Sequence, residues 1–314
     1  MLVAVTGANG FIGKHLCRQL TKDGFKVRAI QRKKAPDVFN IKNLEEDNNW
    51  EDAFLDVDVI IHCASKVHDF GPPSLKSLDL YREINVKATK EIAIKAVQCN
   101  VRKFIFISSI KVNGEKTKLD RPFTNYTSPK PNDNYSISKL EAEDVLKSIS
   151  KKSGIELVII RPPLVYGPGV GANFLSLMKL IFLKIPLPFS LINNKRSFIY
   201  IGNFVCFITE CIKNKSASGK ILAVSDCQSI STQTLVRLIA KSLKIKTIFF
   251  PVPIFILKFL GIITRTNQKI DKITDSLELD TSETFEIMNW SPPYSIEKGI
   301  EITTKWFYSL SKKN

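Results

Sequence analysis

The residues best suited to chemistry are a tyrosine and a lysine four positions apart, Tyr135 and Lys139, in the run Tyr-Ser-Ile-Ser-Lys. In a helix, residues four apart share one face, so we expect the ammonium of Lys139 to lie beside the phenol of Tyr135. A nearby cation favours phenolate and lowers the tyrosine pKa from its usual value of about 10. Such a tyrosine can pass a proton to or from a substrate hydroxyl at neutral pH. The spacing alone is common on helix surfaces and does not identify a site.

A serine stands at the end of an apolar run upstream of this pair. Ser109 closes the run Phe-Ile-Ser-Ser, which predicts the end of a buried strand. Open α/β sheets bind ligands at the edge formed by the carboxyl ends of their strands. A serine there can hydrogen-bond a reacting oxygen, although a strand-ending serine is often only a turn residue. Ser109, Tyr135 and Lys139 are the predicted catalytic residues, and Ser109 is also expected to contact the substrate.

Three glycines join the first predicted strand to the first predicted helix, in Thr-Gly-Ala-Asn-Gly-Phe-Ile-Gly from residue 6. Gly7 allows a tight turn, Gly10 lets the backbone approach a pyrophosphate, and Gly13 lets helix and strand pack closely. The helix N-terminus then directs free N–H groups and the positive end of its dipole at the phosphates. Because the run follows a strand and opens a helix, it predicts a dinucleotide-binding turn.

The end of the second predicted strand bears on the choice of dinucleotide. An acid about 20 residues after the glycines would hold the ribose 2′-hydroxyl of NAD, but Gln31 and Arg32 stand there instead. The planar guanidinium of Arg32 could pair with a 2′-phosphate. This favours NADPH (NADP) as cofactor, with NAD as the alternative, and on local grounds Arg32 could equally be an ordinary exposed arginine.

Elsewhere the first half of the chain alternates short apolar runs with amphipathic stretches, which predicts an α/β fold with a doubly wound parallel sheet. We expect strands at 2–6, 26–30, 57–63, 103–108, 156–161 and 220–224, and helices at 11–23, 77–99, 134–153 and 231–243. After Pro162-Pro163 the rhythm becomes irregular. This predicts a Rossmann domain over 1–165, and a smaller C-terminal substrate-binding lobe over 166–314, with pieces near 200–226 returning to the sheet domain.

Composition excludes several classes of protein. The 314 residues carry a formal net charge of +16, but the lysines are scattered and no nucleic-acid-binding motif accompanies them, so no nucleic-acid partner is expected. The six cysteines lack Cys-x-x-Cys spacing and the three histidines form no cluster with them, which predicts reduced thiols and no metal site. The N-terminus enters an apolar strand directly, without a signal peptide, which predicts a cytoplasmic location.

Two apolar stretches, 174–192 and 249–263, are interrupted by lysine and proline. A membrane span needs about 20 largely uninterrupted apolar residues, so no transmembrane segment is expected. Packing within the substrate-binding lobe is the favoured interpretation, and a peripheral membrane contact through 254–263 stays open.

Six motifs, read in order, add a resemblance that covers essentially the whole chain. They are the glycine run from residue 6, Ile-His-Cys-Ala-Ser from 61, Ile-Asn-Val-Lys-Ala-Thr from 84, Phe-Ile-Ser-Ser-Ile-Lys-Val-Asn-Gly from 106, Tyr-Ser-Ile-Ser-Lys from 135 and Arg-Pro-Pro-Leu-Val-Tyr-Gly-Pro-Gly from 161. The set resembles the extended short-chain dehydrogenases, the NAD-dependent epimerase/dehydratase family that includes UDP-galactose 4-epimerase. Within it, Ser-Ser-Ile-Lys-Val-Asn-Gly-Glu and the late Asn-Trp-Ser-Pro-Pro look like bacterial UDP-4-keto-6-deoxy-N-acetylglucosamine 4-reductases of O-antigen (lipopolysaccharide) synthesis.

The resemblance implies roles for individual residues. Ser109, Tyr135 and Lys139 would form the catalytic trio, with Lys139 also holding the nicotinamide ribose. Asn173 and Arg196 would contact the UDP part of the substrate. Family members commonly dimerise through two helices of the sheet domain, here 77–99 and 134–153, so a homodimer is implied. The residues lining the dinucleotide would be Gly7, Gly10, Phe11, Ile12, Gly13, Ala64, Tyr135, Lys139 and Pro162.

The chain also departs from the pattern of the family epimerases. They usually carry an acid at the Gln31 position and tyrosine at the Asn113 position, and an acid near the Asn43 position that contacts adenine. They also place a late arginine on the diphosphate, for which 264–282 offers no clear counterpart.

The missing acid at Gln31 favours a reductase that draws on NADPH, forming UDP-N-acetylquinovosamine from UDP-4-keto-6-deoxy-N-acetylglucosamine. The alternative is a UDP-glucose or UDP-N-acetylglucosamine 4-epimerase with bound NAD. A more remote one is a non-catalytic dinucleotide-binding scaffold, which typically loses the catalytic tyrosine or lysine.

Overall fold

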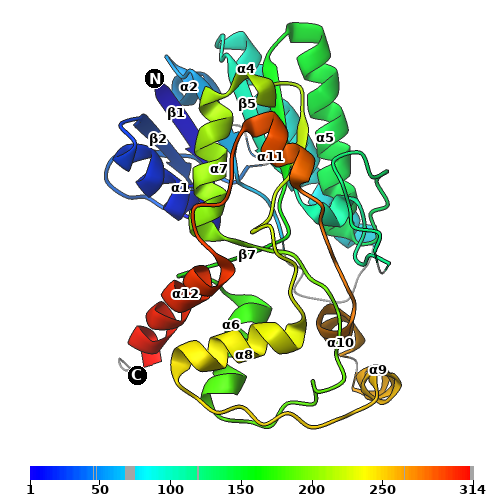
Figure 1. Ribbon diagram of the computed structural model, residues 1–314. Helices are drawn as coiled ribbons and strands as arrows, with labels where there is room; N and C mark the ends of the chain where they lie inside the picture. The colour runs from blue at the N-terminus through cyan, green and yellow to red at the C-terminus, as the bar shows by residue number, and fades with distance from the viewer. Residues whose placement is uncertain (45, 47, 68–74, 119, 265, 312–314) are drawn as a thin grey trace.

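A parallel sheet of seven strands forms the centre of the molecule, in the order β3-β2-β1-β4-β5-β6-β9 (Figure 1). The structure, a computed structural model, describes residues 1–314 except 45, 47, 68–74, 119, 265 and 312–314. The strand order reverses between β1 and β4, and ligands of such sheets bind at that point. The strands are β1 (Leu2–Thr6), β2 (Lys26–Gln31), β3 (Val38–Asn40), β4 (Val59–His62), β5 (Lys103–Ile107), β6 (Glu156–Arg161) and β9 (Ile221–Ala223).

Helices cover both faces of this sheet because its strands are apolar on both. Val3 and Val5 of β1 face the cluster that includes Leu16 of α1 (Phe11–Lys22) and Phe204 of α7 (Ile201–Lys213). Ala4, between them, faces the opposite cluster, which contains residues of α2, α4 and α5. The bounds on that side are α2 (Trp50–Phe54), α4 (Ala88–Gln98) and α5 (Asn134–Ser153). The predicted α/β class with a doubly wound parallel sheet is confirmed.

The helix expected over 77–99 is interrupted. It consists of α3 (Leu75–Arg82), a π-helical turn (Glu83–Lys87) and α4. The side chain of Asn85, in the π turn, accepts a hydrogen bond from the backbone N–H of Lys66 at 2.7 Å and donates one to its carbonyl at 3.0 Å. The π turn therefore directs the side chain of Asn85 toward the backbone of Lys66. Such turns often mark functional sites.

A second group of helices lies below the sheet as drawn in Figure 1. In it α8 (Thr232–Leu243) packs against α6 (Ala172–Phe182) and α12 (Ile296–Ser311), and α9 (Ile254–Ile263) packs against α10 (Asn267–Thr274). A two-stranded parallel sheet, β7 (Leu164–Tyr166) with β8 (Phe198–Tyr200), lies between this group and α7. The chain then returns to the large sheet through α7 and β9, and α11 (Ser282–Met288) packs near that return.

The cysteines of this fold are unpaired thiols. All six cysteines are free, and burial raises the pKa of Cys17 to about 11 and of Cys63 to about 12, which keeps both as neutral thiols. Within the described part of the chain, no group of three His, Cys, Asp or Glu residues could hold a metal ion. The described helices include none that is long and apolar enough to cross a membrane.

Candidate active site

The glycine turn after β1 leaves room that side chains would fill. Gly7 has φ +70°, a left-handed conformation that favours glycine, and a Cβ there would approach the backbone nitrogen of Ala64 to 2.8 Å. A Cβ at Gly13 would come within 2.2 Å of the Gly7 carbonyl oxygen. Side chains at either position would therefore displace backbone. The turn brings Gly7, Gly10, Gly13 and Ala64 together, as a dinucleotide site requires.

The N-terminus of α1 is open to an anion. Gly10 is its N-cap, no side chain caps it, and its first turn carries no acidic residue. Phe11 and Ile12, the first two residues of the helix, are partly buried against the core. The first N–H groups of a helix lack partners within it, and together with the helix dipole they favour phosphate. These features fit a dinucleotide pyrophosphate.

The adenosine end of this site contains a small polar network. Arg32 follows β2, is exposed, and donates from Nη1 to the side-chain oxygen of Asn43 at 3.3 Å. Asn43 in turn donates to the carboxylate of Glu46 at 2.6 Å. Arg32 is therefore linked to a carboxylate through Asn43.

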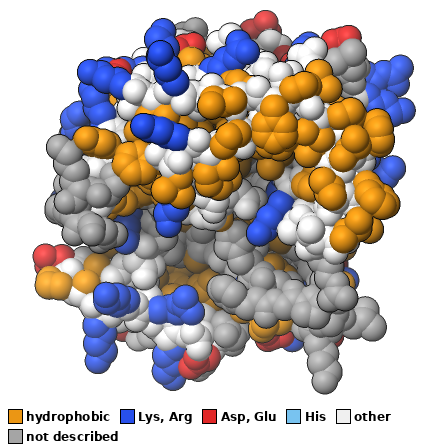
Figure 2. All heavy atoms as spheres, turned by 90° about the horizontal axis from the view of Figure 1, so that it is seen from below, with side chains coloured by type: hydrophobic (Ala, Val, Ile, Leu, Met, Phe, Trp, Pro, Cys, Tyr) orange, Lys and Arg blue, Asp and Glu red, His pale blue; other side chains and the backbone are white. Residues whose placement is uncertain are grey.

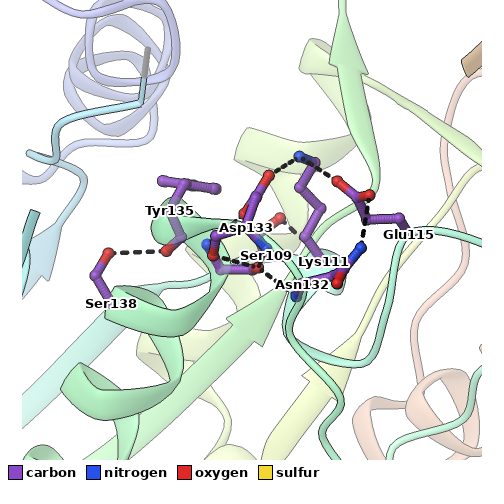
Figure 3. A network of polar contacts seen from close by, with 8 residues as sticks. Ser109, Lys111, Glu115, Asn132, Asp133, Tyr135 and Ser138 are labelled. Carbon is purple, nitrogen blue, oxygen red and sulfur yellow. Dashed lines mark hydrogen bonds and ion pairs between the residues drawn. The ribbon is translucent and has the colours of Figure 1, made fainter. Parts of the chain in front are cut away.

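Ser109 and Tyr135, two of the catalytic candidates, lie where β5 ends and α5 begins (Figure 3). Asp133 is the N-cap of α5 and exchanges hydrogen bonds with Ser136 in a capping box, which fixes the first turn that carries Tyr135. Ser109 follows β5, and its hydroxyl lies close enough to the phenol of Tyr135 to affect the pKa of that phenol. The carbonyl of Pro162 accepts from the N–H of Ile110 at 3.0 Å, which fixes the backbone directly after Ser109. The structure therefore brings Ser109 and Tyr135 together at this edge.

The electrostatics of Tyr135 differ from the expectation. Burial, with a smaller contribution from Asp133, raises its pKa above the ordinary value, and the nearby hydroxyl of Ser109 opposes the rise. The sequence predicted a lowered pKa caused by Lys139. Instead, the Lys139 ammonium lies over the ring of Phe106, 3.9 Å from its centroid. Tyr135 is thus a neutral phenol, a proton donor, until another positive charge reaches it.

Lys139 is almost fully buried, and this changes its own protonation. Burial lowers the pKa of Lys139 from 10.5 to about 7, although Glu143 and Cys63 favour the ammonium. Its neighbour His62 is buried too, and its pKa falls to about 3 because of burial and the charge of Lys139. The charge of Lys139, which lies next to the site, therefore changes near neutral pH.

A buried ion pair holds α5 against the sheet beneath these residues. Glu143 accepts from Arg161 of β6, whose Nε lies 2.9 Å from its carboxylate, and from the hydroxyl of Ser108 at 2.5 Å. Arg161 also donates to Asn113 at 3.1 Å, and Asn113 donates to the carbonyl of Thr127 at 2.6 Å. Sequence reasoning missed Glu143, although its place one helical turn after Lys139 was a usable signal. Asn113, which departs from the family pattern, is thus built into the support of the site.

The π turn supports α5 from its other side. Asn85 donates to the hydroxyl of Ser138 at 3.0 Å, and Ser138 donates to the carbonyl of Tyr135 at 2.8 Å. The motif Ile-Asn-Val-Lys-Ala-Thr therefore reaches the first turn of α5 through a single asparagine. This gives the interruption of the expected helix its use.

Cations from the lower helices extend toward the same edge. Arg196 is nearly buried, donates to the backbone carbonyl of Asp275 at 2.8 Å, and has its pKa lowered to about 10 by burial. Lys272 of α10 has a lowered pKa because of partial burial and then of the charges of Lys111 and Arg196. Lys111 pairs with Asp133, the N-cap beside Tyr135 (Figure 3). Lys272 thus lies within electrostatic reach of the catalytic edge, and Arg196 lies within electrostatic reach of Lys272.

Two outcomes concern the expected substrate contacts. Of the cations in 264–282, Arg265 lies outside the described residues, and Lys272 interacts electrostatically with Lys111 and Asp133. Sequence reasoning did not single out Lys272. Asn173 is exposed in the first turn of α6. Arg196 and Lys272 are therefore the stronger candidates for contacts with an anionic substrate.

Comparison with known proteins gives the chain its relatives. Residues 3–224 match the NAD dependent epimerase/dehydratase family. The chain is 38% identical over 317 residues to the UDP-glucose 4-epimerase of Vibrio cholerae, covering 99% of this chain and 97% of that protein. It is 25% identical to the N-acetyl-alpha-D-glucosaminyl-diphospho-ditrans,octacis-undecaprenol 4-epimerase of Escherichia coli O157:H7, over 99% and 97% of the two chains.

Solved structures share the fold at lower sequence identity. A UDP-glucose 4-epimerase of Thermotoga maritima, solved with UDP-glucose, superposes with a TM-score of 0.80 at 18% identity, over 99% of this chain and 100% of that one. A UDP-glucuronic acid 4-epimerase of Bacillus cereus, solved with NAD, gives 0.79 at 22% identity, over 99% of each chain. These similarities show that the whole chain shares one fold with them.

Proposed function

The chain belongs to the NAD-dependent epimerase/dehydratase family, and from that premise we propose that it is a 4-epimerase of a UDP-hexose. The observation that carries the proposal is that Ser109 and Tyr135 lie next to each other at the ligand-binding edge of the sheet, in a fold whose first turn is the glycine turn. The full-length similarity to a UDP-glucose 4-epimerase supports the choice of substrate and of reaction.

In the proposed reaction, this chain's residues handle the proton and the orientation of the sugar. Ser109 would hold O4 by a hydrogen bond. The positive charge of the oxidised nicotinamide cofactor, when bound, would lower the pKa of Tyr135, which would then remove the O4 proton and later return it. Lys139 binds the nicotinamide ribose, and Gly7, Gly10 and the N-terminus of α1 bind the pyrophosphate. When bound, the nicotinamide cofactor supplies hydride acceptance and donation. Epimerisation also requires the oxidised sugar to turn over in the cleft before the proton is returned.

The diphosphate of the substrate is assigned to Arg196 and Lys272, which are positively charged and lie within electrostatic reach of each other, Lys272 also within reach of the catalytic edge. Arg196 offers several donors in one plane, which suits a diphosphate, and Lys272 offers a mobile point charge. We also retain Asn173, exposed at the start of α6, as a contact to the uridine part. The lobe over 166–314 would thus bind the nucleotide sugar, and 1–165 the dinucleotide.

A second candidate is the NADPH-dependent 4-keto-sugar reductase, which one observation favours. Arg32 presents an exposed guanidinium after β2 at the position where NAD-binding members carry an acid, and its charge suits a 2′-phosphate. Under this alternative Tyr135 only protonates O4. The same trio serves both reactions, so the cofactor and the fate of the hydride distinguish them.

Assembly and location complete the proposal. Between α4 and α5 lies a shallow, largely apolar groove lined by Ile94, Val97, Val145 and Ile149, among others. It lies on the two helices through which we propose that a homodimer forms. Because UDP-sugars and nicotinamide dinucleotides are cytoplasmic metabolites, we also propose a cytoplasmic location.

The test combines cofactor extraction with two assays on the purified protein. For an epimerase we expect bound NAD, and UDP-glucose or UDP-N-acetylglucosamine equilibrating with its C4 epimer without added cofactor, as followed by proton NMR. Stoichiometric loss of NADPH absorbance with UDP-4-keto-6-deoxy-N-acetylglucosamine, and no epimerisation, would establish the reductase instead. Neither activity, despite dinucleotide binding, would leave a non-catalytic scaffold.

A further inference from the structure

The outer face of α9 is apolar and unpacked, which is unusual for a surface helix. We call the side chains of Phe255, Ile256, Phe259, Ile262 and Ile263 the α9 face. Phe255 is 72% exposed, Phe259 62%, Ile262 67% and Ile263 62%. Their positions recur with helical spacing on one side of the helix. A helix in water normally turns such residues toward the core, so α9 is inverted.

The inner side of α9 confirms the inversion. Leu257 packs against the main core, and Gly261 is buried against α10, where a Cβ would meet Ile270 at 2.7 Å. Lys258, the only ionisable residue of the helix, is tied to Asp275 at 2.9 Å and Asp271 at 3.5 Å. The charge is thus held by neighbouring protein groups, while the phenylalanines face outward.

The apolar surface continues beyond the helix. The backbone of Leu187 pairs with Ile248 and Phe250, so the segment after α6 lies beside the segment that leads into α9. This pairing places other exposed apolar side chains in the same region: Leu183, Ile185, Leu191, Ile248 and Phe250. Figure 2, which views the molecule from this end, shows hydrophobic side chains gathered over a broad area with Lys and Arg side chains among them. A patch of this size marks an interaction surface.

The charge around this patch has one sign. The sequence from 227 to 270 contains no Asp or Glu. Exposed cations in the same stretch include Lys244, Lys246 and Lys269. Arg237 lies over the ring of Phe249, 5.6 Å from its centroid, and so ties one more cation to the apolar segment. The patch therefore offers apolar side chains with a positive margin and no acidic residue from its own stretch.

We propose that the α9 face docks this protein on the surface of an anionic lipid bilayer. Its ten residues span about 15 Å as a helix, which is too short to cross and suits a position in the plane of the interface. Apolar side chains enter the acyl boundary, and the lysines at the margin meet acidic headgroups.

A second copy of the chain fits the same face less well. In a twofold contact each patch meets its own equivalent, so the lysines of one copy would face the lysines of the other. An anionic bilayer instead neutralises them. Because α9 packs on α10, docking would also place the lipid surface beside the helix that carries Lys272. The inference stands independently of the reaction proposed for the site.

The test is sedimentation of the purified protein with vesicles made from equal amounts of phosphatidylcholine and phosphatidylglycerol. We expect the protein to sediment with these vesicles, less with pure phosphatidylcholine, and less at high salt. The double variant Phe255→Ser/Phe259→Ser should lose vesicle partitioning by about tenfold or more, because both anchors are removed. Leu55→Ser is the matched control, since Leu55 is 61% exposed outside the lower group of helices, and should bind like the wild type.

Two further measurements keep the outcomes distinct. Turnover of a UDP-sugar in solution should be unchanged in the double variant, which separates docking from catalysis and from misfolding. Light scattering reports the oligomeric state. Absence of vesicle binding by the wild type, or equal binding by the double variant, would overturn the proposal. A wild-type dimer that the double variant converts to a monomer would assign the face to a second copy.

Discussion

Helices α5 and α9 break the usual separation of polar and apolar residues in opposite directions. α5 buries Ser136, Ser138, Lys139 and Glu143 under the sheet edge, each with polar or aromatic partners. α9 exposes phenylalanine and isoleucine and ties its one charge to the protein. Burying polar groups costs stability unless each is bonded, and exposing large apolar groups wastes their burial. Both departures mark surfaces that serve something other than folding.

The difference lies in what supports each helix. Ser138 and Glu143 of α5 are bonded to the π turn, to Ser108 after β5 and to β6, and Lys139 lies over the ring of Phe106. These buried polar side chains are therefore positioned. The outer residues of α9 are bonded to nothing within the described chain, so they are available. Positioned groups suit chemistry at fixed atoms, whereas available apolar groups suit a soft, non-directional partner such as a bilayer.

The largest expected effect is on catalysis. Tyr135→Phe removes only the phenolic oxygen, so kcat should fall by about 10²–10⁴-fold while the fold is kept. Steady-state kinetics measures kcat, and circular dichroism checks that the fold is kept. Tyr126→Phe is the control, because Tyr126 is 78% exposed and bonds Glu283 away from the site. Equal loss in both variants would contradict the role given to Tyr135.

The next effect is on stability through the support of α5. Glu143→Ala leaves Arg161 buried without its partner, and breaking such a pair costs about 3–5 kcal/mol. Urea unfolding should show this loss. Glu143→Gln keeps an acceptor and should lose less. A change below about 1 kcal/mol for Glu143→Ala would mean that the network does not hold the helix.

Lys139→Met should stabilise the protein while it abolishes turnover. The folded-state pKa of Lys139, about 7, lies below the unfolded value of 10.5, so the folded state is penalised fully below pH 7. The penalty fades as the pH rises toward 10.5. The variant should therefore gain on the order of 3 kcal/mol at low pH and progressively less at high pH. Unfolding at several pH values measures the gain, and a pH-independent gain would contradict it.

Lys272→Gln tests the role of α10, the helix that carries Lys272. Removal of one positive charge from the diphosphate-binding site should raise KM about tenfold and change kcat little. Lys269→Gln, on the same helix, is the matched control and should leave KM unchanged in a solution assay. Equal KM values for Lys272→Gln and wild type would remove Lys272 from the substrate site.

The smallest expected effect is on α9 itself. Phe259→Ser should change the free energy of unfolding by no more than about 0.5 kcal/mol, because Phe259 is 62% exposed. Phe104→Ala, in the sheet core, should cost about 3–5 kcal/mol for comparison. A large loss for Phe259→Ser would mean that the α9 face is packed in solution.

Local patterns predicted the sheet half of the molecule well. β1 and β6 have the expected bounds, and the glycine turn and the Ser109–Tyr135 pair are where the motifs indicated. These features depend on residues close in sequence. β3 and the β7–β8 pair, all three-residue strands, were missed because so few positions show no period, whereas β9 was predicted because it lies in a longer apolar run, 221–224.

The rest of the site depends on contacts between distant residues. The pair of Glu143 and Arg161, the π turn at Asn85 and the approach of Lys272 all join separate segments, which periodicity does not report. The predicted shift of the Tyr135 pKa was wrong in direction. Burial and Asp133 raise this pKa, and the ammonium of Lys139 lies over the ring of Phe106 instead.

The central claim is that Tyr135 and Ser109 serve an enzyme that takes hydride from C4 and returns it there. The direct test is incubation of the purified protein with UDP-glucose carrying deuterium at C4, followed by mass spectrometry and NMR of the product. The account predicts the C4 epimer with the deuterium retained at C4. With the Tyr135→Phe variant it predicts no epimer. An epimer that has lost the label, or no epimer with any UDP-hexose, would contradict it.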